Sequence, residues 1–154
     1  MSDLSYTVIG VDPGPEPGLV ALYIEAQRLV TSGVWGRGNP TAVIFDEMVS
    51  ARDRDAVVWV AVEKFVFSRA TSRNRHGASH ETHAMAEDVA QYARGLGLKT
   101  QFLGAGNVKP WATDSRLREF GLWDGLPNGH HRDAARHALF MAQRGGILPK
   151  TVTA

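Results

Sequence analysis

The sequence predicts an α/β fold in which a mixed five-stranded sheet is covered by helices on both faces. Its first 35 residues contain three short apolar segments separated by turn-forming residues, which is typical of antiparallel strands. The rest of the chain alternates helical and strand patterns, as in folds with parallel strand pairs. Residues 56–62 are apolar without polar alternation, so we expect a central strand that is covered on both faces. The 154 residues are expected to form one domain, 1–154.

The first predicted strand ends in an acidic turn. A β-branched run at residues 8–11 is followed by Asp12, and then by Pro13, which has no backbone donor, and Gly14, which can adopt positive φ. Asp12 is equally consistent with an acid that opens a turn and with a carboxylate held at a sheet edge to meet a metal or phosphate. The short proline-rich connection to a second apolar segment, residues 18–24, predicts a hairpin.

The later elements are predicted from periodicity and end signals. Residues 29–35 form a third strand before a glycine-rich break, and the three initial strands are expected to be antiparallel. Asn39-Pro40 is a favourable helix start, because Asn caps and Pro suits the first helical position. The further predicted elements are a strand at 56–62, a helix at 79–96, a strand at 98–103, a short helix capped by Thr113 or Asp114 and ending near 120, a loop at 123–129 and a helix at 130–144.

The composition excludes several kinds of site. The chain is 44% apolar and 21% charged, which is ordinary for a globular protein. It has no cysteine, which excludes disulfides, thiolate zinc sites and cysteine nucleophiles and fits a cytoplasmic location. No apolar run approaches the roughly 20 residues of a membrane span, and the N-terminus does not resemble a signal peptide. The formal net charge is +1, but residues 64–75 hold four basic residues and no acidic one.

Four residues predict a site for divalent cations. Asp12 and Glu63 each end a predicted strand, and His130 and Asp133 share one face of the last helix. An alanine-rich stripe beside them would let that helix approach the sheet closely. Carboxylates and an imidazole suit Mg²⁺ or Mn²⁺, and two such ions about 4 Å apart can promote phosphodiester cleavage. His137, on the same face, is expected to be either a partner of Asp133 or a further ligand.

Four short segments occur along the sequence in the order found in a known nuclease family. They are VIGVDPG at 8–14, VAVE at 60–63, VK at 108–109 before a predicted helix, and HHRDA at 130–134. Because of these segments, the sequence resembles the RuvC family of Holliday-junction resolvases within the RNase H-like superfamily, especially its bacteriophage-encoded members. The resemblance spans nearly the whole chain and implies an RNase H-like fold.

The resemblance also implies roles for individual residues. The family's four metal-binding positions, which are also catalytic, fall on Asp12, Glu63, His130 and Asp133. Histidine is an accepted variant at the position of His130. The family's basic residue before the third helix falls on Lys109, where it would meet the scissile phosphate or its developing charge. The implied cofactors are Mg²⁺ or Mn²⁺, with two ions in each active site.

The segment after Glu63 is predicted to bind DNA. Its basic residues lack acidic neighbours, which favours phosphate contacts over a solvated loop. The family carries an aromatic residue three positions after the strand-end acid, where this chain has Val66 between two phenylalanines. Those phenylalanines are either core or loop anchors or the residues that stack on bases. The predicted DNA-binding residues are Lys64, Phe65, Phe67, Arg69, Arg73, Arg75 and Lys109.

The resemblance predicts a crossover junction endodeoxyribonuclease that makes paired symmetric nicks in four-way DNA junctions during recombination, repair or phage DNA processing. A junction has two related strands to cut, so a twofold homodimer without membrane attachment is expected. Alternatives are a nuclease for flaps or forks and a non-catalytic nucleic-acid binder with the same fold. An actin-like ATPase or sugar kinase also begins with a strand and an acidic glycine turn, but this chain is short for two such domains and lacks a second glycine-rich phosphate loop.

Overall fold

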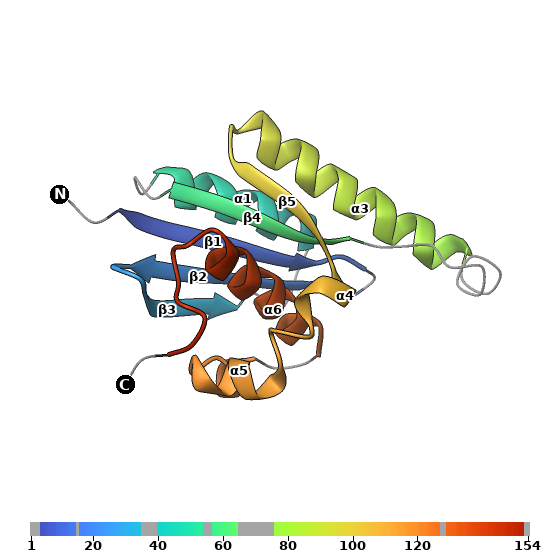
Figure 1. Ribbon diagram of the computed structural model, residues 1–154. Coiled ribbons are helices and arrows are strands. Elements are labelled where there is room, and N and C mark those ends of the chain that lie inside the picture. The colour runs from blue at the N-terminus through green and yellow to red at the C-terminus, as the bar shows by residue number, and fades with distance from the viewer. Residues whose placement is uncertain are drawn as a thin grey trace.

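The computed structural model describes residues 4–14, 16–34, 40–53, 57–64, 76–126 and 129–152. These residues form a five-stranded sheet with helices on both faces, as the sequence predicts (Figure 1). The strands are β1 (Ser5–Asp12), β2 (Gly18–Glu25), β3 (Arg28–Val34), β4 (Val57–Lys64) and β5 (Lys99–Gly104). The helices are α1 (Pro40–Asp53), α3 (His76–Gly95), α4 (Ala105–Val108), α5 (Asp114–Glu119), the 3₁₀ helix η1 (Trp123–Gly125) and α6 (Gly129–Arg144).

The sheet has the strand order β3-β2-β1-β4-β5. The pairs β1–β2 and β2–β3 are antiparallel, because short connections can only return the chain alongside the preceding strand. The pairs β1–β4 and β4–β5 are parallel, and helices α1 and α3 occur in the two connections that lead into β4 and β5. This mixed arrangement confirms the predicted fold class.

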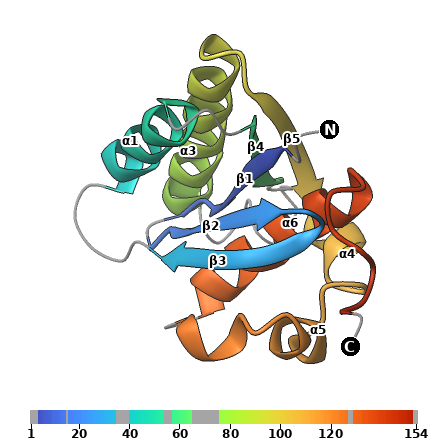
Figure 2. The same ribbon diagram turned by 90° about the vertical axis from the view of Figure 1, so that its left-hand side faces the viewer.

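Different helices cover the two faces of the sheet. Because side chains alternate along a strand, Ile9 and Val11 of β1 point to one face, and Val8 and Gly10 point to the other. The Ile9 and Val11 side chains pack with residues of α1 and α3, whereas Val8 packs with residues of α6. Figure 2 shows α1 and α3 on one side of the sheet and α6 on the other. Both layers are apolar where they meet the sheet, so each face contributes its own core.

Helix α6 approaches the sheet unusually closely. A Cβ atom added to Gly10 of β1 would lie 2.0 Å from the backbone oxygen of Ala134, and one added to Gly18 of β2 would lie 2.0 Å from that of His130. A side chain at either strand position would therefore push the helix backbone away. The close contact fixes the height and register of α6, and the alanine-rich stripe predicted from the sequence lies in this interface, where Ala134 and Ala138 are fully buried.

The boundaries of several elements differ from the predicted ones. The helix predicted at residues 79–96 begins earlier, at His76, and the predicted loop at 123–129 contains η1. Helix α4 was not predicted, because four residues give no readable periodicity. Thr113 caps α5, accepting a hydrogen bond from the backbone N–H of Arg116, so the Thr113 alternative is confirmed. Within the described ranges, no helix is both long enough and apolar enough to cross a membrane.

Candidate active site

Strands β1 and β4 bring Asp12 and Glu63 to the same edge of the sheet. The two strands are parallel, with Val11 opposite Val62, so the next residue of each strand lies at the same level. The alternation of side chains places both acids on the face covered by α6, as it does Val8 of β1 and Ala61 of β4. The sequence-predicted pair of strand-end carboxylates is therefore brought together.

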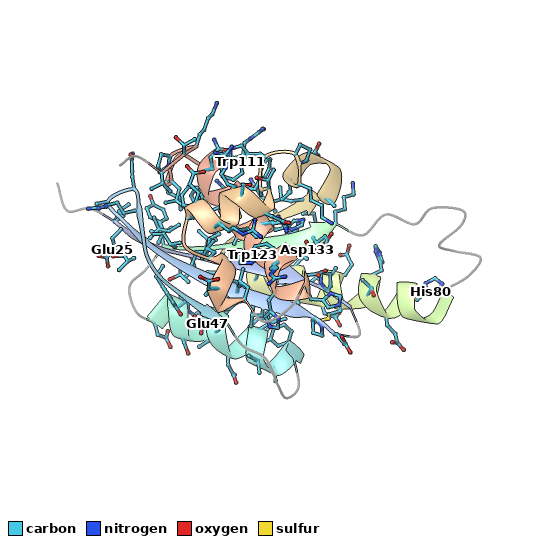
Figure 3. The ribbon with its side chains drawn as sticks, turned by 90° about the horizontal axis from the view of Figure 1, so that it is seen from below. Glu25, Glu47, His80, Trp111, Trp123 and Asp133 are labelled. Carbon is cyan, nitrogen blue, oxygen red and sulfur yellow. The ribbon has the colours of Figure 1, made fainter. Side chains whose placement is uncertain are left out.

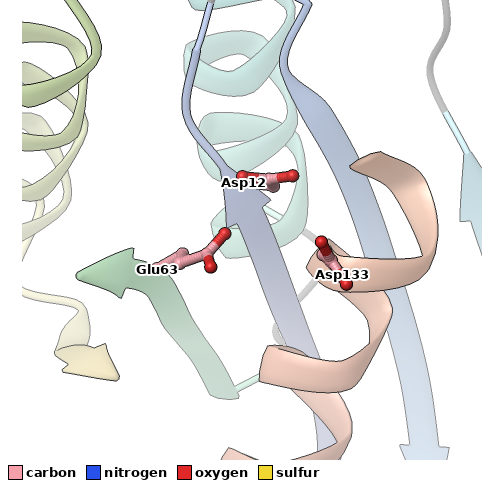
Figure 4. A group of neighbouring side chains, drawn as sticks. All are labelled: Asp12, Glu63 and Asp133. Carbon is pink, nitrogen blue, oxygen red and sulfur yellow. The ribbon is translucent and has the colours of Figure 1, made fainter. Parts of the chain in front are cut away.

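Helix α6 adds a third carboxylate to this edge. Asp133 immediately precedes Ala134, whose backbone rests against Gly10, so the close helix–sheet contact places its side chain near the ends of the strands. Ligand atoms of Asp12, Glu63 and Asp133 all lie within 4.8 Å of one another. Figure 4 shows the three side chains converging from β1, β4 and α6. Among the described residues, this is the only group of three or more acidic or histidine side chains with such spacing.

The crowding of negative charge has an electrostatic consequence. Burial, a side-chain hydrogen bond with Glu63 and the negative charges of Glu63 and Asp133 raise the pKa of Asp12 to about 9, against an opposing effect of Lys109. Asp12 is 7% exposed, so water does little to stabilise its charged form. At neutral pH the group therefore retains a proton that an added cation would displace.

Among the described residues, a lysine and an arginine contact Asp133. The Lys109 Nζ lies 3.8 Å from Oδ2 of Asp133, which agrees with the predicted position of this lysine beside the site. The Nε of Arg136 donates to Oδ1 of Asp133 at 3.3 Å. Arg136 was not among the sequence-predicted site residues. Its position one helical turn after Asp133 is the signal that could have identified it.

Arg136 also connects the site to the segment that precedes it in the chain. Its guanidinium donates to the backbone oxygen of Ala112 at 2.7 Å and to Oδ1 of Asp114, at the start of α5. The Arg136 side chain is 12% exposed, so these bonds are partly shielded from water. We infer that Arg136 orients Asp133 and holds α5 beside α6.

The two histidines predicted near the site have different contacts. The Nδ1 of His130 lies 3.0 Å from Oδ2 of Asp12, so this residue is beside the carboxylates but is not one of the group of three. His137 is fully buried, and its Nδ1 donates to the backbone oxygen of Asp133 at 2.7 Å. Its link to Asp133 is therefore through the main chain. The Nε2 atom of His137 has no hydrogen-bond partner among the described residues.

Most of the predicted DNA-binding segment lies outside the described residues. This applies to Phe65, Phe67, Arg69, Arg73 and Arg75. Lys64, the last residue of β4, is described and exposed, and it follows Glu63 directly. Lys109 is also half exposed beside Asp133. The described part of the predicted interface therefore consists of two lysines: Lys109, which lies beside Asp133, and Lys64, which follows Glu63 in β4.

The arrangement of the site fits a bound divalent cation. Three carboxylates supply the hard oxygen ligands that Mg²⁺ and Mn²⁺ prefer. Burial is the largest cause of the raised pKa of Asp12, and the hydrogen bond and charge of Glu63 and the charge of Asp133 add to it, so a cation at this position would stabilise the charged form. Such a group, open to a half-exposed lysine, is suited to binding a phosphate ester through a cation.

Comparison with known proteins agrees with this architecture. No protein-family model matches the sequence, and no curated protein matches it. Among solved structures, the chain is similar to "T. thermophilus RuvC in complex with Holliday junction substrate", with a TM-score of 0.63 and 21% sequence identity. The alignment covers 92% of this chain and 97% of that one. The chain therefore has the RuvC-type RNase H-like fold.

Proposed function

We propose that this protein is a divalent-metal-dependent endonuclease that cuts four-way DNA junctions by paired symmetric nicks. The observation that carries the proposal is the convergence of Asp12, Glu63 and Asp133 from three distant segments within 4.8 Å. A protein that only binds nucleic acid has no need for acids at the surface that meets phosphate. The RuvC-type fold supports the same reaction class, since the similar solved structure is of a RuvC bound to a Holliday junction.

In this proposal the three carboxylates hold Mg²⁺ or Mn²⁺, with His130 as a fourth ligand. When bound, two such ions supply Lewis-acid stabilisation of the phosphate charge and lower the pKa of water. The chain itself orients the ligands: β1 and β4 hold Asp12 and Glu63 at one level, and Arg136 fixes Asp133. His130 lies beside Asp12, where it can serve as that fourth ligand.

Lys109 is proposed to meet the scissile phosphate. Its ammonium is half exposed and lies 3.8 Å from Asp133, so it faces both the carboxylates and solvent. A cation at this position would attract a phosphodiester and offset the charge that develops as the bond breaks. Lys64 and the basic segment that follows it are proposed to contact neighbouring DNA phosphates.

The proposed substrate requires a second copy of the chain. A four-way junction presents two symmetry-related strands, and a twofold homodimer would present two equivalent sites to them. Paired cuts at matched positions would then give ends that a ligase can seal. Flaps and forks lack this symmetry, so their cleavage would not depend on the dimer.

The test is cleavage of labelled four-way junctions, forks, flaps and linear duplexes with Mg²⁺, with Mn²⁺ and with a chelator. We expect metal-dependent symmetric nicks in the junction and poor cutting of linear duplex. Faster cutting of forks or flaps would replace the resolvase proposal with a broader branched-DNA nuclease. Absence of cutting with either metal would leave only a nucleic-acid-binding function.

A further inference from the structure

A second cluster of cationic side chains lies near the site and is organised around one indole ring. The guanidinium carbon of Arg118 lies over the Trp123 ring at 4.1 Å from its centroid, and that of Arg132 lies over the same ring at 3.9 Å. The three residues come from α5, η1 and α6 respectively. A ring that holds two guanidinium groups places two like charges close together, which is unfavourable unless an anion lies nearby.

These two arginines differ from others in the same region. Arg116 pairs with Glu119 at 3.7 Å, and Arg136 pairs with Asp114. Within the part of the chain that the structure describes, neither Arg118 nor Arg132 forms an ion pair with a carboxylate. Among the described residues, the buried Nε of Arg132 also has no hydrogen-bond partner. The nearest described influence on an acid is the weaker effect of both charges on Asp114, which Arg136 already occupies.

The positive field of this cluster reaches a neighbouring carboxyl group. A hydrogen bond from Arg136 lowers the pKa of Asp114 and outweighs the opposing effect of desolvation, and the charges of Arg136, Arg118 and Arg132 lower the pKa further. Asp114 already has Arg136 as its partner. A further anion supplied from outside the chain would meet the same field.

The cluster and the three carboxylates share helix α6. Arg132 directly precedes Asp133 on α6, so their side chains leave adjacent positions of one helix. Figure 3 views the molecule from the side on which α6 and α5 cover the sheet, and it labels Trp123 and Asp133 there. A DNA strand with one phosphate at the carboxylates could place a neighbouring phosphate at Arg132 and Arg118.

We propose that Arg118, Trp123 and Arg132 form a second phosphate-binding site for the DNA backbone beside the scissile position. The proposal rests on the proposed nuclease function for its substrate, but the ligand chemistry is the phosphodiester group alone. Arg presents a planar set of donors that matches phosphate oxygens. The Trp123 ring restricts both side chains before DNA arrives, which lowers the entropy cost of binding.

The experiment measures the affinity of a labelled four-way junction in a chelator, between about 50 and 200 mM salt. The test variant is Arg118→Ala with Arg132→Ala. The slope of log affinity against log salt is negative, and each lost phosphate contact makes it shallower by about 0.9. For the double variant we expect a slope that is shallower by about 1.8. Affinity near physiological salt should fall on the order of tenfold.

A matched control removes the same charge and the same type of ring contact elsewhere. Arg94 lies over Phe102 at 5.6 Å and Arg144 lies over Phe140 at 5.5 Å, so Arg94→Ala with Arg144→Ala is the control pair. We expect its salt slope to stay close to that of the unmodified protein. Arg118→Ala alone is a second test, because Arg118 is exposed and its loss should not impair folding. We expect this single variant to have a slope that is shallower by about 0.9.

The outcomes separate this inference from the proposed function. A test pair whose slope matches that of the control pair would show that the cluster only packs α5 against α6, and the inference would be overturned even if junctions are cut normally. A decreased slope in a protein that cuts no branched DNA with Mg²⁺ or Mn²⁺ would support the phosphate site while the nuclease proposal fails. Arg118→Lys with Arg132→Lys should keep most of the slope, because it keeps both charges.

Discussion

Two aspartates of this protein lie in opposite electrostatic surroundings. Asp12 is buried beside Glu63 and Asp133, and its pKa is raised to about 9. Asp114 is exposed at the start of α5, and its pKa is lowered, first by a hydrogen bond from Arg136 and then by the charges of nearby arginines. The charged form of an aspartate is therefore disfavoured by its surroundings at Asp12 and favoured by its surroundings at Asp114.

The opposite electrostatic surroundings of Asp12 and Asp114 distinguish a candidate cation-binding site from a contact that only holds two helices together. At Asp114 the chain provides its own cation, so the pair joins α5 to α6 and requires no ligand. At the three carboxylates, burial and neighbouring negative charge disfavour the charged form of Asp12, so a proton or a metal cation at this position is favourable. Arg136 connects the two regions, because its guanidinium donates hydrogen bonds to both Asp133 and Asp114.

The largest expected effect is on catalysis. Asp12→Asn and Glu63→Gln should lower junction cleavage more than about 100-fold, which exceeds the usual effect of losing a residue outside the ligand shell. Junction binding should remain, because each change also removes negative charge that faces phosphate. Asp114→Asn is the matched control and should retain cleavage within a few-fold. Equal losses of cleavage and binding in folded Asp12→Asn or Glu63→Gln protein would contradict the assignment.

A change beneath α6 should disrupt the site without touching a carboxylate. Gly10→Ala places a Cβ against the backbone of Ala134, so it should lower the free energy of unfolding by about 3 kcal/mol and weaken cleavage by displacing Asp133. Urea denaturation and junction cleavage measure the two effects. Gly95→Ala is the control, because nothing lies within 4 Å of its added Cβ. A Gly10→Ala protein with unchanged stability and cleavage would show that the close approach does not position the site.

Removing Arg136, which contacts Asp133 and Asp114, should have an intermediate effect on cleavage. Arg136→Ala takes a donor from Asp133 and another from Ala112, so we expect a 10- to 100-fold loss of cleavage, the usual range for a residue that orients a metal ligand. The readout is the Mg²⁺ concentration that gives half-maximal cleavage, which should rise. If Arg136→Ala lowers the melting temperature but leaves the Mg²⁺ dependence unchanged, Arg136 serves only to hold α5.

The smallest expected effect is on the pH dependence of stability in a chelator. The folded-state pKa of Asp12 is raised from 3.8 to about 9, so between these values the folded protein holds a proton that the unfolded chain has lost. The contribution of Asp12 to stability therefore falls as pH rises through this window. Melting temperatures of Asp12→Asn should exceed those of the unmodified protein by a margin that grows with pH.

Asp114 supplies the opposite control for this experiment. Its pKa is lowered, so its stabilising contribution is present at neutral pH and is lost as pH falls through the acidic range. Asp114→Asn should therefore remove stability near neutrality and have less effect in acid. Parallel pH profiles for the two variants would be inconsistent with the opposite surroundings of the two aspartates.

The sequence predicted the sheet and its two acids for physical reasons. Strands β1 and β4 could be predicted because their apolar, β-branched runs end in Asp12 and Glu63. Since the two strands are parallel neighbours, their carboxyl ends lie at the same edge of the sheet. Asp133 could be predicted because its helix has a marked stripe of small residues. The order of strands and helices followed from the short early connections and the later alternation.

Other features depend on tertiary contacts that local pattern does not encode. The spacing of Arg136 from Asp133 is visible in the sequence, but only the fold brings Ala112 and Asp114 to its guanidinium. Helix α4 is too short for a periodic signal. The Trp123 ring meets two arginines from separate helices, and a lone tryptophan in a glycine-rich segment gives no indication of such partners. The roles of Phe65, Phe67, Arg69, Arg73 and Arg75 stay predictions.

The contact of α6 with β1 and β2 has a consequence for the synthesis of the chain. His130 meets Asp12 across 118 residues, a length that a ribosome takes about 6 to 24 s to translate. During that time the strands that carry Asp12 and Glu63 can form, but Asp133 has not yet been added. A nascent chain therefore cannot assemble the full carboxylate group until the last helix has left the ribosome and docked on the two strand glycines, and the proposed nuclease activity would begin only at that point.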